Sequence, residues 1–202
     1  MSIAIDVRAA ATPLGAAVAA GVGVGVATSF GQAHLGLPWL ALCNSGSAWL
    51  VAPFLVGWLA HTRGAAAALG LATCMLEVVG YELASHLRGV PVNEAQMVFW
   101  SVCALVGGPA FGAAAHLRRT AGLRIRGFGG TFLAASFAAE GLWVYMRTLD
   151  YTSTAVLWFA IAAAWLALLA RRPVDLRWLP LTLAAGVAAE IGIAATYVHS
   201  FG

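Results

Sequence analysis

Three glutamate residues, Glu77, Glu140 and Glu190, each lie in the middle of a long apolar segment of the chain. A charged carboxylate at the centre of a lipid bilayer costs about 2.5–3.5 kcal/mol on insertion scales, so such residues usually face the interior of a protein and serve its function. Burial favours the neutral carboxylic acid, and three neighbouring carboxylates cannot all be ionised. We therefore expect at least one of the three to be a neutral acid at pH 7 that can donate a proton.

Other polar and aromatic residues recur at helical spacing from these glutamates. Positions i, i+4, i+7 and i+11 of an α-helix share one face, so each glutamate is expected to begin a stripe that runs through an aromatic ring toward one membrane surface. Two of the stripes end in an arginine. If the stripes converge, the three glutamates are the catalytic residues of one acidic pocket with aromatic walls. The expected substrate-binding residues of this pocket are Trp143, Tyr81, Tyr145, Tyr197, Trp100, Ser136, Arg88 and Arg147.

The composition predicts a polytopic membrane protein. Of the 202 residues, 61% are hydrophobic and only 9% are charged, whereas soluble domains carry about 25% charged residues. All eleven basic residues are arginines, and nearly all lie in short gaps between apolar runs. There they act as topology signals, so the lipid bilayer is the expected partner and nucleic acid is not.

About 20 apolar residues cross a bilayer as a helix. The predicted fold is therefore all-α, a single integral membrane domain over residues 1–202 with seven transmembrane helices, arranged as three hairpins and a final helix. The first run resembles a signal peptide but is longer than a typical one, so we expect it to be a retained helix. Pro53 and Pro109 are expected to kink their helices, and Pro13 and Pro180 to lie near helix starts. The seven runs are 13–34, 39–61, 65–87, 93–117, 128–148, 153–171 and 178–200.

The arginines also orient this bundle. In a seven-span arrangement nine arginines fall on one side of the membrane, and only Arg88 and Arg147 fall on the other. Arginine is enriched in cytoplasmic loops, so the N-terminus is predicted to be cytoplasmic. Six spans would break this segregation.

The three predicted hairpins share a pattern that indicates an internal repeat. In the second helix of each, a cluster of polar residues precedes a tryptophan. Such self-similarity implies that the hairpins stack around a common centre. Glu94, Asp150 and Asp175 lie beside predicted helix starts and are expected to cap them. The three polar clusters are Asn44, Ser45 and Ser47; Asn93, Glu94 and Gln96; and Thr152, Ser153 and Thr154.

Four segments resemble an actinobacterial membrane family catalogued as domain of unknown function 6518. They are NSGSAW at 44–49, GYELA at 80–84, FWSVCALVGGPAFG at 99–112 and EGLWVY at 140–145. The resemblance spans most of the chain. It implies a multi-pass protein of the bacterial cytoplasmic membrane, and it brings no established activity, so no functional residue is carried over from it.

The absence of several motifs narrows the chemistry. The histidines are scattered without metal-ligand spacing, and the chain has no aspartate-rich motif and no nucleotide-binding glycine pattern. We therefore expect no metal and no cofactor. The favoured function is a Brønsted-acid enzyme, a terpene cyclase or isomerase, that acts on a lipophilic, isoprenoid-like small molecule. The chain is similar in size and span number to the small seven-span membrane terpene cyclases, a likeness at fold level only.

Two other classes of function stay open. Titratable glutamates within a membrane also suit a proton-coupled small-molecule transporter, for which a homodimer would provide room for two gates. An accessory membrane subunit is the third class.

Overall fold

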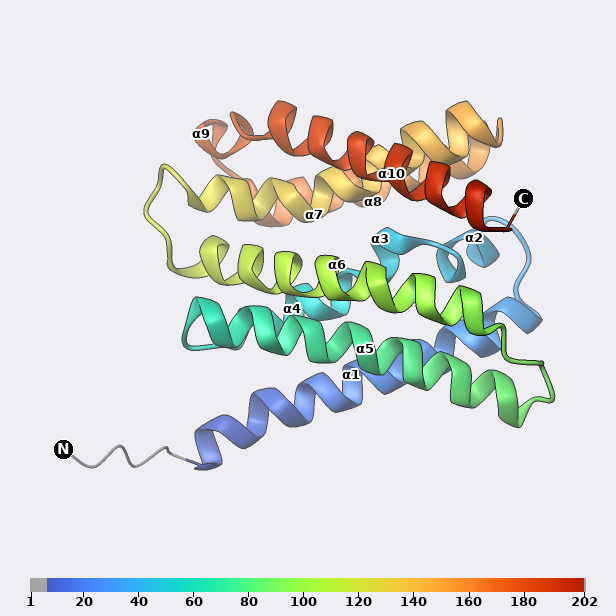
Figure 1. Ribbon diagram of the computed structural model, residues 1–202. Helices are drawn as coiled ribbons and strands as arrows, with labels where there is room; N and C mark the ends of the chain where they lie inside the picture. The colour runs from blue at the N-terminus through green and yellow to red at the C-terminus, as the bar shows by residue number, and fades with distance from the viewer. Residues whose placement is uncertain (1–6, 202) are drawn as a thin grey trace. The chain divides into compact units, whose positions relative to one another are not determined.

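The computed structural model describes residues 7–201, with side chains described for residues 12–196, and every regular element in this part of the chain is helical (Figure 1). The expected all-α class is therefore confirmed. In chain order the helices are α1 (Val7–His34), α2 (Trp39–Cys43), α3 (Gly46–Trp49), α4 (Val51–Trp58), α5 (Arg63–Leu87), α6 (Glu94–Thr120), α7 (Arg126–Glu140), the π-helix η1 (Gly141–Thr148), α8 (Thr152–Leu169), α9 (Pro173–Leu176) and α10 (Leu179–Phe201).

Five of the described helical segments are long and apolar enough to cross a membrane. They correspond to the first, third, fourth, sixth and seventh predicted runs, and they mark the chain as a membrane protein. The count of seven spans stays a prediction, because the second and fifth runs are not single α-helices. The five segments are Thr12–His34, Arg63–Leu87, Glu94–Thr120, Thr152–Leu169 and Pro173–Thr196.

The second run is divided into the short helices α2, α3 and α4. The division follows from residues that favour helix ends, because an asparagine and a serine precede Gly46. Ser45 has an extended backbone, with φ −98° and ψ 121°, and its hydroxyl oxygen accepts a hydrogen bond from the N–H of Ala48. This is the geometry of an N-cap, so α3 starts a new helix. Pro53 lies in the first turn of α4, where its missing N–H breaks no helical hydrogen bond.

The fifth run changes its helical type halfway. The 15-residue α7 ends at Glu140 and continues directly into the eight-residue η1, whose hydrogen bonds follow the wider π-helical pattern. Pro109 lies inside α6, which continues through it. Pro13 lies inside α1, because that helix begins at Val7, six residues before the expected start. Pro180 is the second residue of α10, as expected.

The described residues fold as two compact units, and each is considered by itself. Unit 1 comprises residues 7–30 and 52–116, and its helices pack closely through glycines. A Cβ atom on Gly25 of α1 would overlap the carbonyl oxygen of Glu77 in α5, and one on Gly108 of α6 would lie 2.6 Å from the carbonyl oxygen of Gly70. Gly25 and Gly108 belong to the two GxxxG motifs of the chain, at 21–25 and 108–112. Both motifs lie where two helices pack closely.

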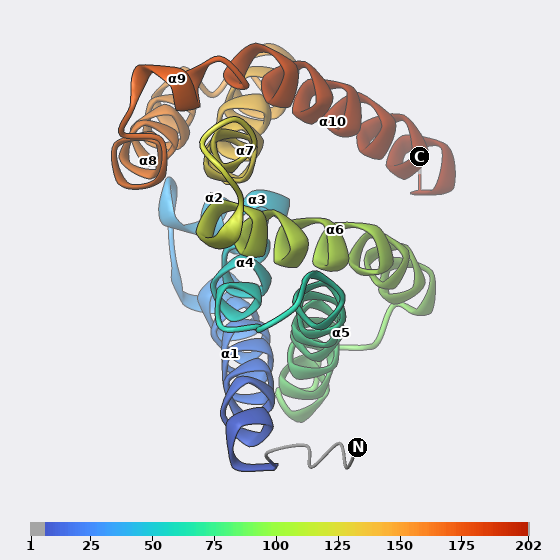
Figure 2. The same cartoon turned by 90° about the vertical axis from the view of Figure 1, so that its left-hand side faces the viewer.

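Unit 2 comprises residues 31–51 and 117–201, and α7 lies at its centre. Helices α8 and α10 both pack against α7 (Figures 1 and 2). Small residues allow these approaches, because a Cβ atom on Gly186 of α10 would lie 2.9 Å from Cβ of Ala139, and one on Gly141 would lie 2.8 Å from Cβ of Trp158 in α8. The single domain expected from the sequence stays a prediction.

Candidate functional site

The carboxyl group of Glu140 lies at the break between α2 and α3. Its Oε2 accepts a hydrogen bond from the hydroxyl group of Ser45 at 2.8 Å and another from the backbone N–H of Ser47 at 2.9 Å. Glu140 is only 3% exposed. The first N–H groups of a helix have no partner within the helix, so Glu140 supplies from α7 an acceptor that α3 lacks.

Two further hydrogen-bond donors lie beside this carboxyl group. The indole Nε1 of Trp158 and the hydroxyl group of Ser47 are buried and close to Glu140, and neither makes a hydrogen bond of ordinary geometry. An unsatisfied buried donor costs about 1–3 kcal/mol. The site therefore contains two hydrogen-bond donors in addition to the two that bond to Glu140.

Tyr145 and Trp158 form an aromatic pair next to the carboxyl group. Their ring centroids are 4.2 Å apart, and the hydroxyl group of Tyr145 donates a hydrogen bond to the carbonyl oxygen of Ala41 at 3.1 Å. Both side chains are buried. Tyr145 thus connects η1 to the short helix α2, on the other side of the break from Ser45.

Glu190 completes the arrangement from α10. It is half-buried and near enough to interact electrostatically with Glu140 and Tyr145. The structure therefore brings two of the three expected glutamates together in unit 2. We call Ser45, Ser47, Glu140, Tyr145, Trp158 and Glu190 the Glu140 site.

The predicted stripe through Ser136, Trp143 and Arg147 assumed α-helical spacing throughout, whereas residues 141–148 are π-helical. The hydrogen bonds of a π-helix join residues five apart, and Tyr145, five residues after Glu140, is near enough to interact electrostatically with its carboxyl group. Trp143 is half-buried and Arg147 is exposed, with its guanidinium group 5.7 Å from the centre of the Trp143 ring. The hydroxyl group of Ser136 bonds back to its own helix, at the carbonyl oxygen of Leu133.

A pocket of about 460 Å³ lies at one end of unit 2. It is an open cavity at the start of α8, and Thr154 is its most deeply buried lining residue. Trp158 follows Thr154 by one helical turn, on the same face of α8. Thr154 therefore connects the pocket lining to the face of α8 that carries Trp158 of the Glu140 site. Its lining residues are Leu37, Pro38, Asp150, Tyr151, Thr152, Ser153 and Thr154.

The third glutamate, Glu77, is fully buried in unit 1. Neither of its carboxyl oxygens makes a hydrogen bond of ordinary geometry, although the Cys74 thiol group lies near it. Since Glu77 and Glu140 belong to different units, the convergence of all three glutamates stays a prediction.

The remaining expected site residues are placed elsewhere. The guanidinium group of Arg88 donates hydrogen bonds to the carbonyl and hydroxyl oxygens of Ser29 and lies 5.5 Å from the centre of the Phe30 ring. Trp100 pairs with Phe99 at 5.1 Å, and Tyr81 is half-buried in α5. All of these residues belong to unit 1. The side chain of Tyr197 lies outside the described residues.

Sequence reasoning missed Ser45, Ser47 and Trp158 as members of the site. All three belong to the polar clusters and tryptophans that indicated the internal repeat. Their shared physical feature is a helix start: Ser45 caps α3, the side chain of Asn93 accepts a hydrogen bond from the N–H of Gln96 at 3.1 Å at the start of α6, and Thr152 begins α8. The residues that favour helix starts could therefore have indicated these positions in the sequence.

The three expected acidic caps differ from one another. The side chain of Asp175 accepts a hydrogen bond from the N–H of Arg172 at the start of α9, as expected for a cap. Asp150 does not cap α8, since it adopts a left-handed backbone with φ 55° at the pocket. Glu94 lies within the first turn of α6. Among the residues with described side chains, no three His, Cys, Asp or Glu side chains are grouped as metal ligands.

Comparison with known proteins identifies a family and no characterised relative. No curated protein and no solved structure matches the chain. A family model described as a family of unknown function matches residues 5–200. This match covers nearly the whole chain, and we conclude that the chain belongs to the family of unknown function DUF6518.

Proposed function

We propose that this chain is a proton-coupled carrier of small molecules, in which Glu140 binds and releases the proton. The observation that carries the proposal is the pair of hydrogen bonds that the carboxyl group of Glu140 accepts from Ser45 and Ser47 at the break between α2 and α3. The proposal includes seven spans, a cytoplasmic N-terminus and a location in the bacterial cytoplasmic membrane.

Interrupted helices support this class of function. Non-helical backbone at membrane depth is tolerated only where it is buried in protein or lines a cavity, and discontinuous helices form the substrate and ion sites of many carriers. Here the interruption is next to a buried carboxyl group and is followed, in α7 and η1, by a change of helical type. Local π-helices are frequent at functional sites.

Protonation of Glu140 would change the hydrogen bonds at the break. An ionised carboxylate is an acceptor only, whereas a protonated carboxyl group carries an O–H donor and accepts more weakly. Proton uptake therefore weakens the bonds from the Ser45 hydroxyl group and the Ser47 N–H, and it frees α3 to move relative to α7. The position of α3 would then depend on whether Glu140 is protonated. Coupled transport requires such a link between proton binding and a change of conformation.

The pocket indicates what such a carrier would accept. Its lining includes one carboxylate, four hydroxyl groups and no basic side chain, together with the apolar side chains of Leu37 and Pro38. A carboxylate without a basic partner disfavours anions. The expected substrate is therefore a neutral or cationic amphipathic small molecule.

A metal-independent acid cyclase or isomerase is the second candidate, and the aromatic pair supports it. The rings of Tyr145 and Trp158, 4.2 Å apart beside Glu140, could stabilise a carbocation that forms when a carboxylic acid protonates an isoprenoid alkene. We place it second because the hydrogen bonds that Oε2 of Glu140 accepts tie the carboxyl group to a helix break, an arrangement typical of carriers that an acid enzyme does not require.

The experiment that separates these functions starts with molecules that co-purify with the protein. Solvent extracts of the purified protein are identified by mass spectrometry, and the recovered compounds are then offered to proteoliposomes under a pH gradient. We expect pH-driven accumulation with the wild type and its loss with Glu140→Gln, while the variant still exchanges labelled for unlabelled compound. Glu94→Gln, which removes an exposed carboxyl group at the start of α6, is the matched control.

Two results would contradict the carrier. The first is pH-driven accumulation by Glu140→Gln at the wild-type rate. The second is chemical conversion of an extracted isoprenoid by the wild type and not by Glu140→Gln, which would establish the acid enzyme instead.

A further inference from the structure

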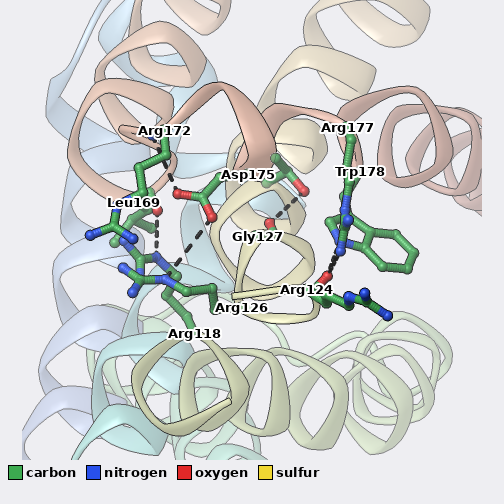
Figure 3. A network of polar contacts seen from close by, with 10 residues as sticks. Arg118, Arg124, Arg126, Gly127, Leu169, Arg172, Asp175, Arg177 and Trp178 are labelled. Carbon is green, nitrogen blue, oxygen red and sulfur yellow. Dashed lines mark hydrogen bonds and ion pairs between the residues drawn. The ribbon is translucent and has the colours of Figure 1, made fainter. Parts of the chain in front are cut away.

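A cluster of arginines surrounds one buried aspartate at the end of unit 2 where α6 ends and α9 begins (Figure 3). Arg118, Arg126, Arg171 and Arg172 are near enough to interact electrostatically with one another or with Asp175. We call these four arginines and Asp175 the arginine cluster. With one carboxylate for four guanidinium groups, the cluster holds an excess of positive charge.

The two half-buried arginines are held by the fold. The Nε of Arg118 donates a hydrogen bond to the carbonyl oxygen of Leu169, at the end of α8. The Nε of Arg126 is 4.0 Å from Oδ1 of Asp175, and neither of these atoms makes a hydrogen bond of ordinary geometry. Gly127 permits this approach, because a Cβ atom there would lie 2.6 Å from the Cα atom of Asp175. The cationic groups are thus positioned in advance, whereas Arg171 and Arg172 are exposed.

Preorganised guanidinium groups in excess favour an anion with several acceptor oxygens. Arginine binds phosphate through paired N–H donors, and such charge-assisted hydrogen bonds are about twice as strong as neutral ones. The Asp175 carboxylate offsets one positive charge only. A phosphate group would provide further acceptor oxygens for these guanidinium groups and offset the remaining positive charge.

The surroundings of the cluster favour a lipid over a soluble phosphate. Four apolar side chains on the segments that carry the arginines are 40–52% exposed, namely Leu123, Ile125, Val174 and Leu176. Trp178 is half-buried beside them, and its indole N–H donates a hydrogen bond to the carbonyl oxygen of Arg124 at 2.9 Å. Tryptophan at this position is typical of the membrane interface, and basic pockets at the cytoplasmic ends of membrane helices bind anionic headgroups.

We propose that the arginine cluster binds the phosphate of an anionic phospholipid, with the acyl chains on the exposed apolar side chains around it. This site is separate from the Glu140 site, and it lies at the membrane face that the arginine distribution predicts to be cytoplasmic. A bound lipid would hold the 121–126 and 170–178 segments together and so fix one end of α7.

The test measures the affinity of the purified protein for phosphatidylglycerol and phosphatidylcholine by native mass spectrometry from detergent micelles. We expect tighter binding of phosphatidylglycerol by the wild type, and a loss of about tenfold in that affinity for Arg118→Gln and for Arg126→Gln. Arg63→Gln, which removes an exposed arginine at the start of α5, is the matched control and should keep the wild-type affinity.

Asp175→Asn is a variant with the opposite expected sign, because it keeps all four arginines and removes the competing carboxylate. We expect it to bind phosphatidylglycerol more tightly than the wild type. The proposal is overturned if Arg63→Gln weakens binding as much as the cluster variants, or if Asp175→Asn does not strengthen it. Displacement of phosphatidylglycerol by millimolar inorganic phosphate would overturn the assignment to a lipid in favour of a soluble phosphate.

Discussion

The hydroxyl group of Ser45 performs two functions in the Glu140 site. Its oxygen accepts a hydrogen bond from the N–H of Ala48 at 3.0 Å and its proton is donated to Oε2 of Glu140 at 2.8 Å. One side chain therefore both starts α3 and orients the carboxyl group that we assign to proton binding. Without this hydroxyl group, α3 would lose its cap and Glu140 would lose a donor.

Replacing Ser45 by Ala is therefore expected to lower the free energy of unfolding by about 1–2 kcal/mol. Ser136→Ala is the matched control in the same unit, because the hydroxyl group of Ser136 bonds only to its own helix. We expect its effect to remain within about 0.5 kcal/mol. Denaturant titration in mixed micelles, followed by circular dichroism, measures both values. If both variants lower the free energy of unfolding equally, the hydrogen bonds of the Ser45 hydroxyl group do not contribute to stability.

At the level of the helices, the sequence predicted where the apolar runs lie. It did not predict that two of them, the second and the fifth, depart from a continuous α-helix. The run at 39–61 was expected to be one kinked helix, and it is broken because Asn44, Ser45 and Gly46 favour a helix end. The acceptor that completes the break is 95 residues away in Glu140, so no local pattern could identify it. The π-helix after Glu140 could not be predicted either, since its contacts are with segments distant in the sequence: it packs against α8, and its Tyr145 bonds to Ala41 of α2.

Close packing of α1 against α5 gives a test at the same level. Gly25→Ala should destabilise the protein by about 1–3 kcal/mol, because a Cβ atom there would overlap the carbonyl oxygen of Glu77. Gly23→Ala is the control on the same helix, where a Cβ atom would have no neighbour within 4 Å. It should stabilise α1 by about 0.5–1 kcal/mol. Thermal unfolding in detergent compares the two, and a Gly25→Ala variant as stable as Gly23→Ala would refute this account of the packing.

At the scale of the whole molecule, composition was sufficient to predict an all-helical membrane protein, and five described helices are able to span a bilayer. The partition into two units was not visible in the sequence, because every gap between runs is short. Of the predicted pocket, Glu140 and Glu190 lie in one unit and Glu77 in the other. Spacing within a helix shows which residues share a face of that helix, but it does not show which helices lie next to one another. The convergence of the three stripes therefore could not be derived from the sequence.

The topology of the chain can be tested by cysteine labelling. With seven spans and a cytoplasmic N-terminus, cysteines introduced singly at Thr62, Ala121 and Val174 of a cysteine-free variant should all be cytoplasmic. A membrane-impermeant thiol reagent should then label them in inverted vesicles and not in intact cells. A cysteine at Gly36 should behave in the opposite way. Labelling of position 121 from outside intact cells would contradict the seven-span arrangement.

Infrared difference spectroscopy of the protein in lipid membranes can show whether Glu140 binds and releases a proton. The carboxylic acid C=O band of a protonated glutamate is resolved from that of its carboxylate. A pH titration of the wild type should contain one carboxylic acid band that is missing from the same titration of Glu140→Gln, while Glu94→Gln retains that band. If the pH-dependent bands of the wild type and Glu140→Gln are the same, Glu140 does not exchange a proton, and its carboxyl group only holds the break between α2 and α3.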